Sequence, residues 1–331
     1  MICEFEHKIF DLKPADFDPL AIDIFHFQYR HNALYKQYVD QIGTDLSAIR
    51  LVEQIPFLPI SFFKSHTILL DNIPAETWFE SSGTTGMIPS RHPVHKLSLY
   101  RDSFFRGFEG FYGPVSDFCI IGLLPSYLER QHSSLVLMVE ELSKACGHPR
   151  SGFYLYDHEK LAAVLKELEQ QQQKVLLIGV TFALLDFAEK FPMRLQHTII
   201  METGGMKGRR EEWTRGQVHA FLMEAFQTDA IHSEYGMTEL LSQGYSTGAG
   251  LFYAPPWMEV LVREEDDPFA ISRKRKSQGV INVIDLANIY SCSFIATDDA
   301  GRIYPDGGFE VLGRVDHSDV RGCSLMAPSQ K

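Results

Sequence analysis

Hydroxyl and glycine residues gather in one segment near the first quarter of the chain. It reads Phe79-Glu80-Ser81-Ser82-Gly83-Thr84-Thr85-Gly86-Met87-Ile88-Pro89. Glycine backbone N–H groups and Ser/Thr hydroxyls at this spacing can surround phosphate oxygens. No Gly-Lys-Ser/Thr follows, which excludes a Walker loop. Taken alone, the segment is also explained as a solvated turn.

Two further polar segments follow later in the chain. Tyr235-Gly236-Met237-Thr238-Glu239 comes directly after an expected strand at 230–234. Its aromatic ring can stack on a base, and its carboxylate can hold Mg²⁺ through oxygen. The stretch 297–316 contains Thr297-Asp298-Asp299, Asp306-Gly307 and Gly313-Arg314-Val315-Asp316. Acids there can bind ribose hydroxyls and Arg314 can neutralise a phosphate, although each segment alone also fits an ordinary turn.

Alternating strands and helices must position these segments. Apolar runs at 118–124, 175–180, 198–201 and 230–231 predict strands, and helical periodicity lies near 133–145, 159–173, 181–190 and 209–226. This alternation predicts an α/β layer with a parallel or mixed sheet.

The two ends of the chain differ from this middle. The first 75 residues are expected to be mostly helical, with an aromatic-rich stretch at 19–41 that suits packing. Beyond 250, the runs 257–262, 279–284, 291–297 and 309–312 predict strands joined by turns such as Asp306-Gly307-Gly308. The mixed-charge run 263–276 is expected to be an exposed loop, with a basic patch as the alternative.

Composition excludes several classes of protein. The 331 residues are 45% apolar and 22% charged, which is ordinary for a globular protein and excludes disorder, collagen and coiled coil for the whole chain. Asp plus Glu number 43 against 31 Lys plus Arg, a net charge of −12. Such a surface repels phosphate backbones, so a general nucleic-acid binder is not expected.

Neither the apolar runs nor the cysteines indicate export. No apolar stretch approaches the roughly 20 residues that span a bilayer, and the first residues are acidic, unlike a signal peptide. The scattered cysteines form no CxxC pair and no zinc spacing; they are Cys3, Cys119, Cys146, Cys292 and Cys323. Reduced thiols in the cytoplasm are therefore expected, with Cys119 in the core.

In this order, the three polar segments resemble the motifs of the adenylate-forming superfamily, which includes acyl-CoA ligases and peptide-synthetase adenylation domains. Residues 81–89 match its phosphate loop, Ser-Ser/Thr-Gly-Thr-Thr-Gly-x-Pro, with one extra residue before Pro89. Residues 235–239 match its Tyr-Gly-x-Thr-Glu motif fully, and Thr297-Asp298-Asp299 and Gly313-Arg314 match its ribose and hinge motifs, with Asp298 replacing a glycine. Met201-Glu202-Thr203-Gly204-Gly205 lies where the superfamily has its adenine-flanking glycines.

Two departures point to one branch of the superfamily. First, Ser90, followed by Arg91, stands where a lysine is usual. Second, only 17 residues follow Arg314 in the chain of 331, so the mobile C-terminal lid with its lysine is expected to be absent. Together with the segment 123–129 and the ending Arg321-Gly322-Cys323-Ser324-Leu325, this makes the chain similar to the acyl-protein synthetases. These are the fatty-acid-activating subunits of the fatty acid reductase complex of bacterial bioluminescence. That branch carries an acylated cysteine near its C-terminus, and Cys323 matches it.

The resemblance implies a fold and a reaction. The fold would be the large α/β domain of adenylate-forming enzymes with a β-rich C-terminal portion. It would divide into a helical segment at 1–78, a core at 79–316 and a tail at 317–331. The protein would use ATP and Mg²⁺ to convert a fatty or other apolar acid to an acyl-adenylate, then form a thioester on Cys323 for a partner such as a reductase. The alternatives are a ligase that delivers the acyl group to CoA or to a carrier protein, and a catalytically weak nucleotide-binding scaffold.

The resemblance also assigns roles to individual residues. Cys323, Glu239 and Arg314 are expected to be catalytic, and Glu239 to bind Mg²⁺. The expected nucleotide-binding residues are Ser81, Ser82, Gly83, Thr84, Thr85, Gly86, Gly204, Gly205, Tyr235, Gly236, Thr238, Asp299 and Arg314.

Overall fold

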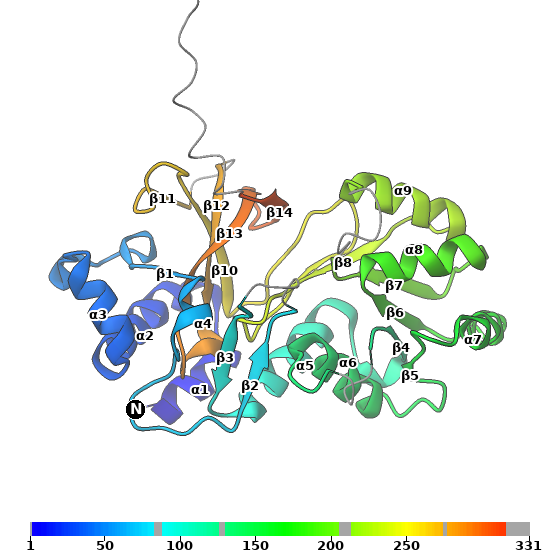
Figure 1. Ribbon diagram of the computed structural model, residues 1–331, viewed down its shortest axis with the longest axis horizontal. Coiled ribbons are helices and arrows are strands. Elements are labelled where there is room, and N and C mark those ends of the chain that lie inside the picture. The colour runs from blue at the N-terminus through cyan, green and yellow to red at the C-terminus, as the bar shows by residue number, and fades with distance from the viewer. Residues whose placement is uncertain (1, 83–87, 126–129, 205–212, 274–276, 316–331) are drawn as a thin grey trace, which may run out of the picture.

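Two six-stranded sheets and a β-hairpin form the framework of the computed structural model (Figure 1). It describes residues 2–82, 88–125, 130–204, 213–273 and 277–315. No helix within these ranges is both long and apolar enough to cross a bilayer.

The first sheet is mostly parallel and contains the strands expected from the alternating pattern. Its order is β5-β4-β6-β7-β8-β9, with only β9 antiparallel to its neighbour. The strands are β4 (Cys119–Leu123), β5 (Gly152–Phe153), β6 (Val175–Gly179), β7 (Thr198–Glu202), β8 (His232–Tyr235) and β9 (Gly244–Ser246). Every residue of β4 and β6 is buried, because helices cover both faces of the sheet, and this accounts for their unbroken apolar sequences.

The helices lie on the two faces of this sheet (Figure 1). Helices α5 (Leu97–Tyr112) and α6 (Ser134–Ala145) lie on one face, and α8 (Thr181–Lys190) and α9 (Arg215–Phe226) on the other, while α7 (His158–Gln170) packs at the outer end. The described part of α9 begins at Arg215 rather than near 209, because Thr214 and Gln217 form a capping box there.

The second sheet contains the β-rich C-terminal part. Its order is β1-β13-β12-β10-β11, with β14 also paired to β13. The strands are β1 (Leu58–Pro59), β10 (Met258–Arg263), β11 (Ile271–Ser272), β12 (Gln278–Asp285), β13 (Phe294–Ile303) and β14 (Phe309–Arg314). Strand β13 continues past the predicted end at 297 because it pairs with β12 and β14 as far as Ile303.

The first helices of the chain pack on this second sheet. They are α1 (Ile2–Phe10), α2 (Phe17–His31), α3 (Ala33–Gln41) and the short α4 (Phe62–Ser65). Phe25 and Tyr35 both contact the ring of Phe294, at centroid distances of 6.2 and 6.3 Å. The Gln28 amide donates to the carbonyls of Asn288 and Ile289 at 3.0 Å each. One continuous apolar core therefore joins these helices, the second sheet and the α5–α6 side of the first sheet.

Part of the mixed-charge run 263–276 is more ordered than expected, while residues 264–269 are exposed as predicted. Residues Ile271–Ser272 form β11, and Arg273 pairs with Asp18 at 2.6 Å and with Glu259 at 2.6 Å. The exposed-loop expectation is therefore wrong for these residues, since partners on α2 and β10 draw them onto the sheet.

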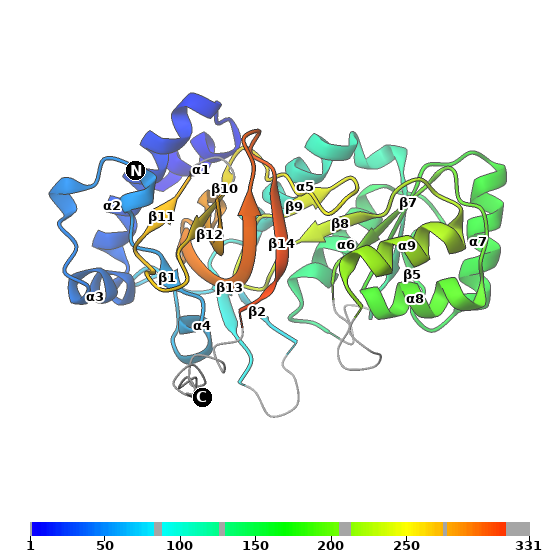
Figure 2. The same ribbon diagram turned by 90° about the horizontal axis from the view of Figure 1, so that it is seen from above.

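The two sheets meet beside the strands that carry the polar segments. Viewed from above, β13 and β14 lie next to β8 and β9 at the junction (Figure 2). An isolated bridge between Phe252 and Phe309 links the two parts of the chain there.

Candidate functional site

Two of the predicted nucleotide segments lie at the carboxyl ends of parallel strands. Gly204 follows β7 and Tyr235 ends β8, and the neighbouring strand ends are joined by backbone bonds from Thr203 to Gly179 and from Thr181 to Gly204. This edge is where ligands bind in open α/β sheets. Six of the expected site residues lie outside the described residues: Gly83, Thr84, Thr85, Gly86, Gly205 and Cys323.

A hairpin holds the two ends of the predicted phosphate loop together. Strands β2 (Thr77–Glu80) and β3 (Arg91–Val94) are antiparallel. Ser81 N–H donates to the Ser90 carbonyl at 3.1 Å, and Ser90 N–H donates to Ser81 Oγ at 2.9 Å. Arg91 pairs with Glu80 across the strands at 2.6 Å, so its charge is engaged at the base of the loop.

Glu239 is buried against the end of this hairpin. Its side chain is 5% exposed and accepts a hydrogen bond from the Ser90 hydroxyl. Burial raises the pKa of the Glu239 carboxyl, while Ser90, Arg314 and Lys64 act in the opposite direction. Its backbone carbonyl accepts from Asn288 at 2.8 Å, which fixes the turn on the second sheet. A carboxylate has about four lone-pair sites, so the Ser90 hydroxyl and the backbone N–H of Glu239 leave oxygen lone pairs for a hard cation.

His92 positions the neighbouring residue Thr238, a role that the sequence did not reveal. The imidazole is 1% exposed, and its Nδ1 lies 2.9 Å from the Thr238 carbonyl. Because a carbonyl only accepts, Nδ1 carries the proton and Nε2 accepts from the Ser291 hydroxyl at 2.9 Å. Burial lowers the pKa of His92 to about 4, so the ring is neutral at pH 7.

Tyr235, Asp299 and Arg314 come together from the three strands β8, β13 and β14. The Tyr235 hydroxyl donates to Asp299 Oδ2 at 3.0 Å, and Arg314 Nε lies 3.6 Å from Asp299 Oδ1. The backbones of Asp299 and Arg314 are paired across β13 and β14. Burial raises the pKa of Asp299, whereas Tyr235 and Arg314 lower it. The Arg314 side chain is 87% exposed, so its guanidinium can also reach a ligand.

Glu202, at the end of β7, accepts hydrogen bonds from Gly204 and from two neighbouring hydroxyl groups. Its carboxylate accepts from Gly204 N–H at 2.7 Å, from the Ser233 hydroxyl at 2.7 Å and from the Thr181 hydroxyl at 3.1 Å. Burial alone would raise the pKa of Glu202, but His219, Ser233, Arg215 and Gly204 lower it to about 2. The signal in the sequence was a lone acid at the end of an apolar run.

Glu234 occupies the opposite face of the same sheet edge. Burial, and secondarily the charge of Glu202, raises the pKa of Glu234 to about 8. When it is ionised, Glu234 also raises the pKa of the buried phenols of Tyr100 and Tyr245. Its carboxyl lies against Gly236, where a Cβ would overlap it. Glycine at that motif position thus leaves room for a protonated acid.

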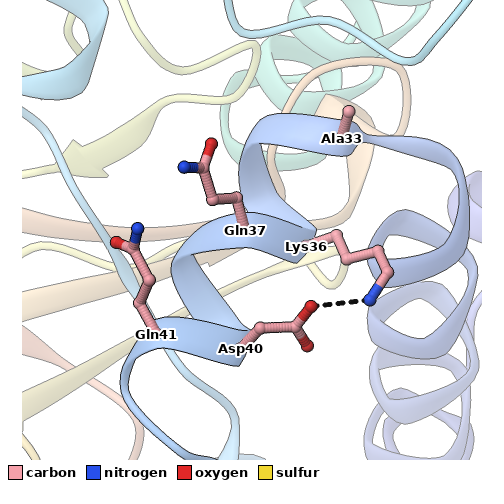
Figure 3. A pocket seen from close by; sticks show the side chains of 5 residues that line it. All are labelled: Ala33, Lys36, Gln37, Asp40 and Gln41. Carbon is pink, nitrogen blue, oxygen red and sulfur yellow. Dashed lines mark hydrogen bonds and ion pairs between the residues drawn. The ribbon is translucent and has the colours of Figure 1, made fainter.

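Two cavities on the described surface lie away from these residues. A shallow pocket of about 420 Å³ lies on α3, where Lys36 and Asp40 form an ion pair (Figure 3). A pocket of about 560 Å³ lies at the amino ends of β6 and β7, the edge opposite the polar segments. Neither contains a residue assigned to the site by the motifs.

Comparisons with known proteins agree with the motifs. A family model described as "Acyl-protein synthetase, LuxE" matches residues 11–330. The chain is 23% identical over 325 residues to the long-chain-fatty-acid–luciferin-component ligase of Vibrio harveyi, covering 91% of this chain and 84% of that protein. It is 36% identical over 69 residues to the Photorhabdus luminescens protein of the same name, covering 20% of this chain and 59% of that one.

Solved structures show the fold. A 2-hydroxyisobutyryl-CoA ligase in its postadenylation state superposes with a TM-score of 0.66 at 12% identity, covering 91% of this chain and 68% of that chain. ATP-bound MatB of Rhodopseudomonas palustris superposes with a TM-score of 0.55 at 16% identity. The match covers 72% of this chain and about half (48%) of the MatB chain. The predicted α/β fold of adenylate-forming enzymes is confirmed.

Proposed function

The chain belongs to the acyl-protein synthetase LuxE family, and we propose that it uses ATP to join a fatty acid to its own Cys323. Family membership makes it a ligase. The observation that supports the site assignment is the contact of Tyr235, Asp299 and Arg314. It joins two motifs, since Tyr235 and Asp299 are 64 residues apart in the chain. The reductase that would take the acyl group, and a cytoplasmic location, belong to the same proposal.

The first step makes the carboxyl carbon a better electrophile. A carboxylate oxygen of the fatty acid attacks the α-phosphorus of ATP, the bond to the β-phosphate oxygen breaks, and pyrophosphate leaves. Ser81, Ser82 and the segment 83–86 supply hydroxyl and N–H donors to the phosphates, and Arg314 offsets the developing charge. Asp299 accepts from the ribose hydroxyls, while Tyr235, Gly236, Gly204 and Gly205 surround the adenine.

Glu239 is the proposed ligand for Mg²⁺. Clusters of three or more His, Cys, Asp or Glu that could hold a metal are absent from the described residues. A single carboxylate nevertheless suits Mg²⁺, which usually binds one or two carboxylates together with substrate phosphates. When bound, the ion would neutralise phosphate charge, and Glu239 would hold it on the turn that His92 and Asn288 fix.

The second step transfers the acyl group to sulfur. A thiolate attacks the acyl carbonyl, the bond to the phosphate oxygen breaks, and AMP leaves with the electron pair. Arg321 would favour the thiolate of Cys323. Cys119 and Cys292 are unsuited because they are buried, which raises the pKa of their thiols to about 11 and about 12.

Fatty-acid-dependent ATP–pyrophosphate exchange tests the first step. Glu239→Gln keeps the size of the side chain and removes its charge, so we expect exchange to fall by about 10²-fold or more with the fold intact. Glu167→Gln is the matched control, since Glu167 lies on α7 away from these residues and makes an ion pair with Arg150. Near-normal exchange in Glu239→Gln would remove Glu239 from the mechanism, and wild-type protein without exchange would leave only the scaffold alternative.

A further inference from the structure

Arg215 at the start of α9 reaches both halves of the site. Its Nε lies 3.4 Å from Glu202 Oε1 at the end of β7, and its terminal nitrogen donates to the Val311 carbonyl of β14 at 2.9 Å. The first contact belongs to the sheet that carries Gly204, and the second belongs to the strand that ends at Arg314.

A second path leads from the same guanidinium to the ribose acid. The Arg215 guanidinium stacks over the ring of Phe252 at 5.1 Å. Phe252 in turn packs against Phe309 at 5.5 Å and against Tyr235 at 6.1 Å, and Tyr235 donates to Asp299. One side chain is thus linked to both strands on which the nucleotide-binding residues lie.

We propose that Arg215 is a positioning residue that holds β14, and with it Arg314, in register with the carboxyl ends of β7 and β8. This inference rests on the proposed function. Arg215 itself is not expected to touch the nucleotide. Its planar guanidinium suits the role, because it can bind a carboxylate and a carbonyl while stacking on an aromatic ring.

The position of Arg215 separates this role from simple stabilisation. Its side chain is 33% exposed and borders a cavity of about 480 Å³, so water competes for its ion pair with Glu202. Glu202 is only 6% exposed, but it keeps its donors Gly204, Ser233 and Thr181 when Arg215 is removed, so the loss of this ion pair should cost only modest folding free energy. A misplacement of about 1 Å between reacting groups, in contrast, can lower the rate about 10²-fold. Loss of Arg215 should therefore reduce activity far more than stability.

The test compares Arg215→Gln, Arg215→Lys and the control Arg150→Gln, another arginine with a carboxylate partner, Glu167 of α7, away from β14. We expect kcat/KM for ATP in pyrophosphate exchange to fall about 10- to 100-fold in Arg215→Gln, with the Tm close to that of the control. Arg215→Lys should lie between them, because one ammonium group can pair with Glu202 without also reaching Val311. A Tm loss in Arg215→Gln with unchanged kcat/KM in the soluble variants would overturn the proposal.

A double-mutant cycle with Arg314→Ala gives the decisive readout. If Arg215 acts through Arg314, the Arg314→Ala substitution should cost much less in the Arg215→Gln or Arg215→Lys protein than in the wild type. Additive losses would overturn the positioning role while leaving the proposed function standing. Wild-type protein without any exchange would overturn the proposed function and this inference together.

Discussion

Replacing Glu234 with Gln should remove a pH-dependent cost of folding. In the folded protein, burial raises the pKa of Glu234 from 4.5 to about 8. Between these two pH values the unfolded chain has released this proton while the folded chain keeps it. Stability therefore falls as the pH rises through this window, by up to about 1.4 kcal/mol per pH unit.

The size of the effect follows from the width of the window. Below pH 4.5 both states hold the proton and the cost vanishes, whereas at pH 7 it reaches about 3 kcal/mol. Glutamine has a similar shape and no ionisation. Glu234→Gln should thus gain stability over the wild type as the pH rises, with the two differing by about 2–3 kcal/mol more at pH 7.5 than at pH 5.5.

Urea unfolding at half-unit steps between pH 5.5 and 7.5 measures this difference, once the transition has been shown to be reversible and two-state. Glu264→Gln is the control, because it makes the same chemical change on an exposed side chain. A constant difference between Glu234→Gln and the wild type over the whole range would show that Glu234 is ionised throughout. The argument from burial would then be wrong.

Two further substitutions test the glycines of the motifs. Gly83→Val should raise the KM for ATP or abolish ATP binding, because the backbone there must approach phosphate. An unchanged affinity for ATP, measured by calorimetry on the folded variant, would show that residues 81–86 are an ordinary surface turn. Gly236→Ala should cost about 1–3 kcal/mol of unfolding free energy, since its Cβ would overlap the Glu234 carboxyl. Urea unfolding should show this cost largely relieved in the Glu234→Ala protein, and an equal cost in both backgrounds would contradict the contact.

The fold of the first sheet could be predicted because its strands carry their own signal. Strands β4 and β6 are unbroken apolar runs buried on both faces, and the helices between them have clear periodicity. The hairpin β2–β3 gave no such signal, since it is only four residues per strand and contains Pro93. The hairpin is instead held by hydrogen bonds. Ser81 and Ser90 bond to each other across it, and His92 bonds to Ser291, which is far away in the chain.

The motifs name candidate site residues in the sequence, whereas the roles of other residues depend on tertiary contacts that the sequence does not show. Tyr235 and Asp299 belong to two of these motifs, and the structure brings their side chains into contact. Glu202 and Glu234 are single acids in similar strand positions, yet one has its pKa lowered and the other raised. Their partners lie on opposite faces of one sheet, and no local spacing distinguishes those faces. Arg215 was missed for the same reason, because its partners are on β7 and β14.

Mapping the acyl group on the protein tests the central claim most directly. Protein incubated with ATP, Mg²⁺ and a long-chain fatty acid would be digested and analysed by mass spectrometry with and without hydroxylamine. We expect a hydroxylamine-sensitive acyl group on the peptide that contains Cys323. Cys323→Ser should lose this group and keep fatty-acid-dependent pyrophosphate exchange, because the first step needs no thiol, and Cys146→Ser serves as the matched control at a buried cysteine. A thioester on the Cys323→Ser protein, or acyl transfer from the wild type only to added CoA, would contradict the account.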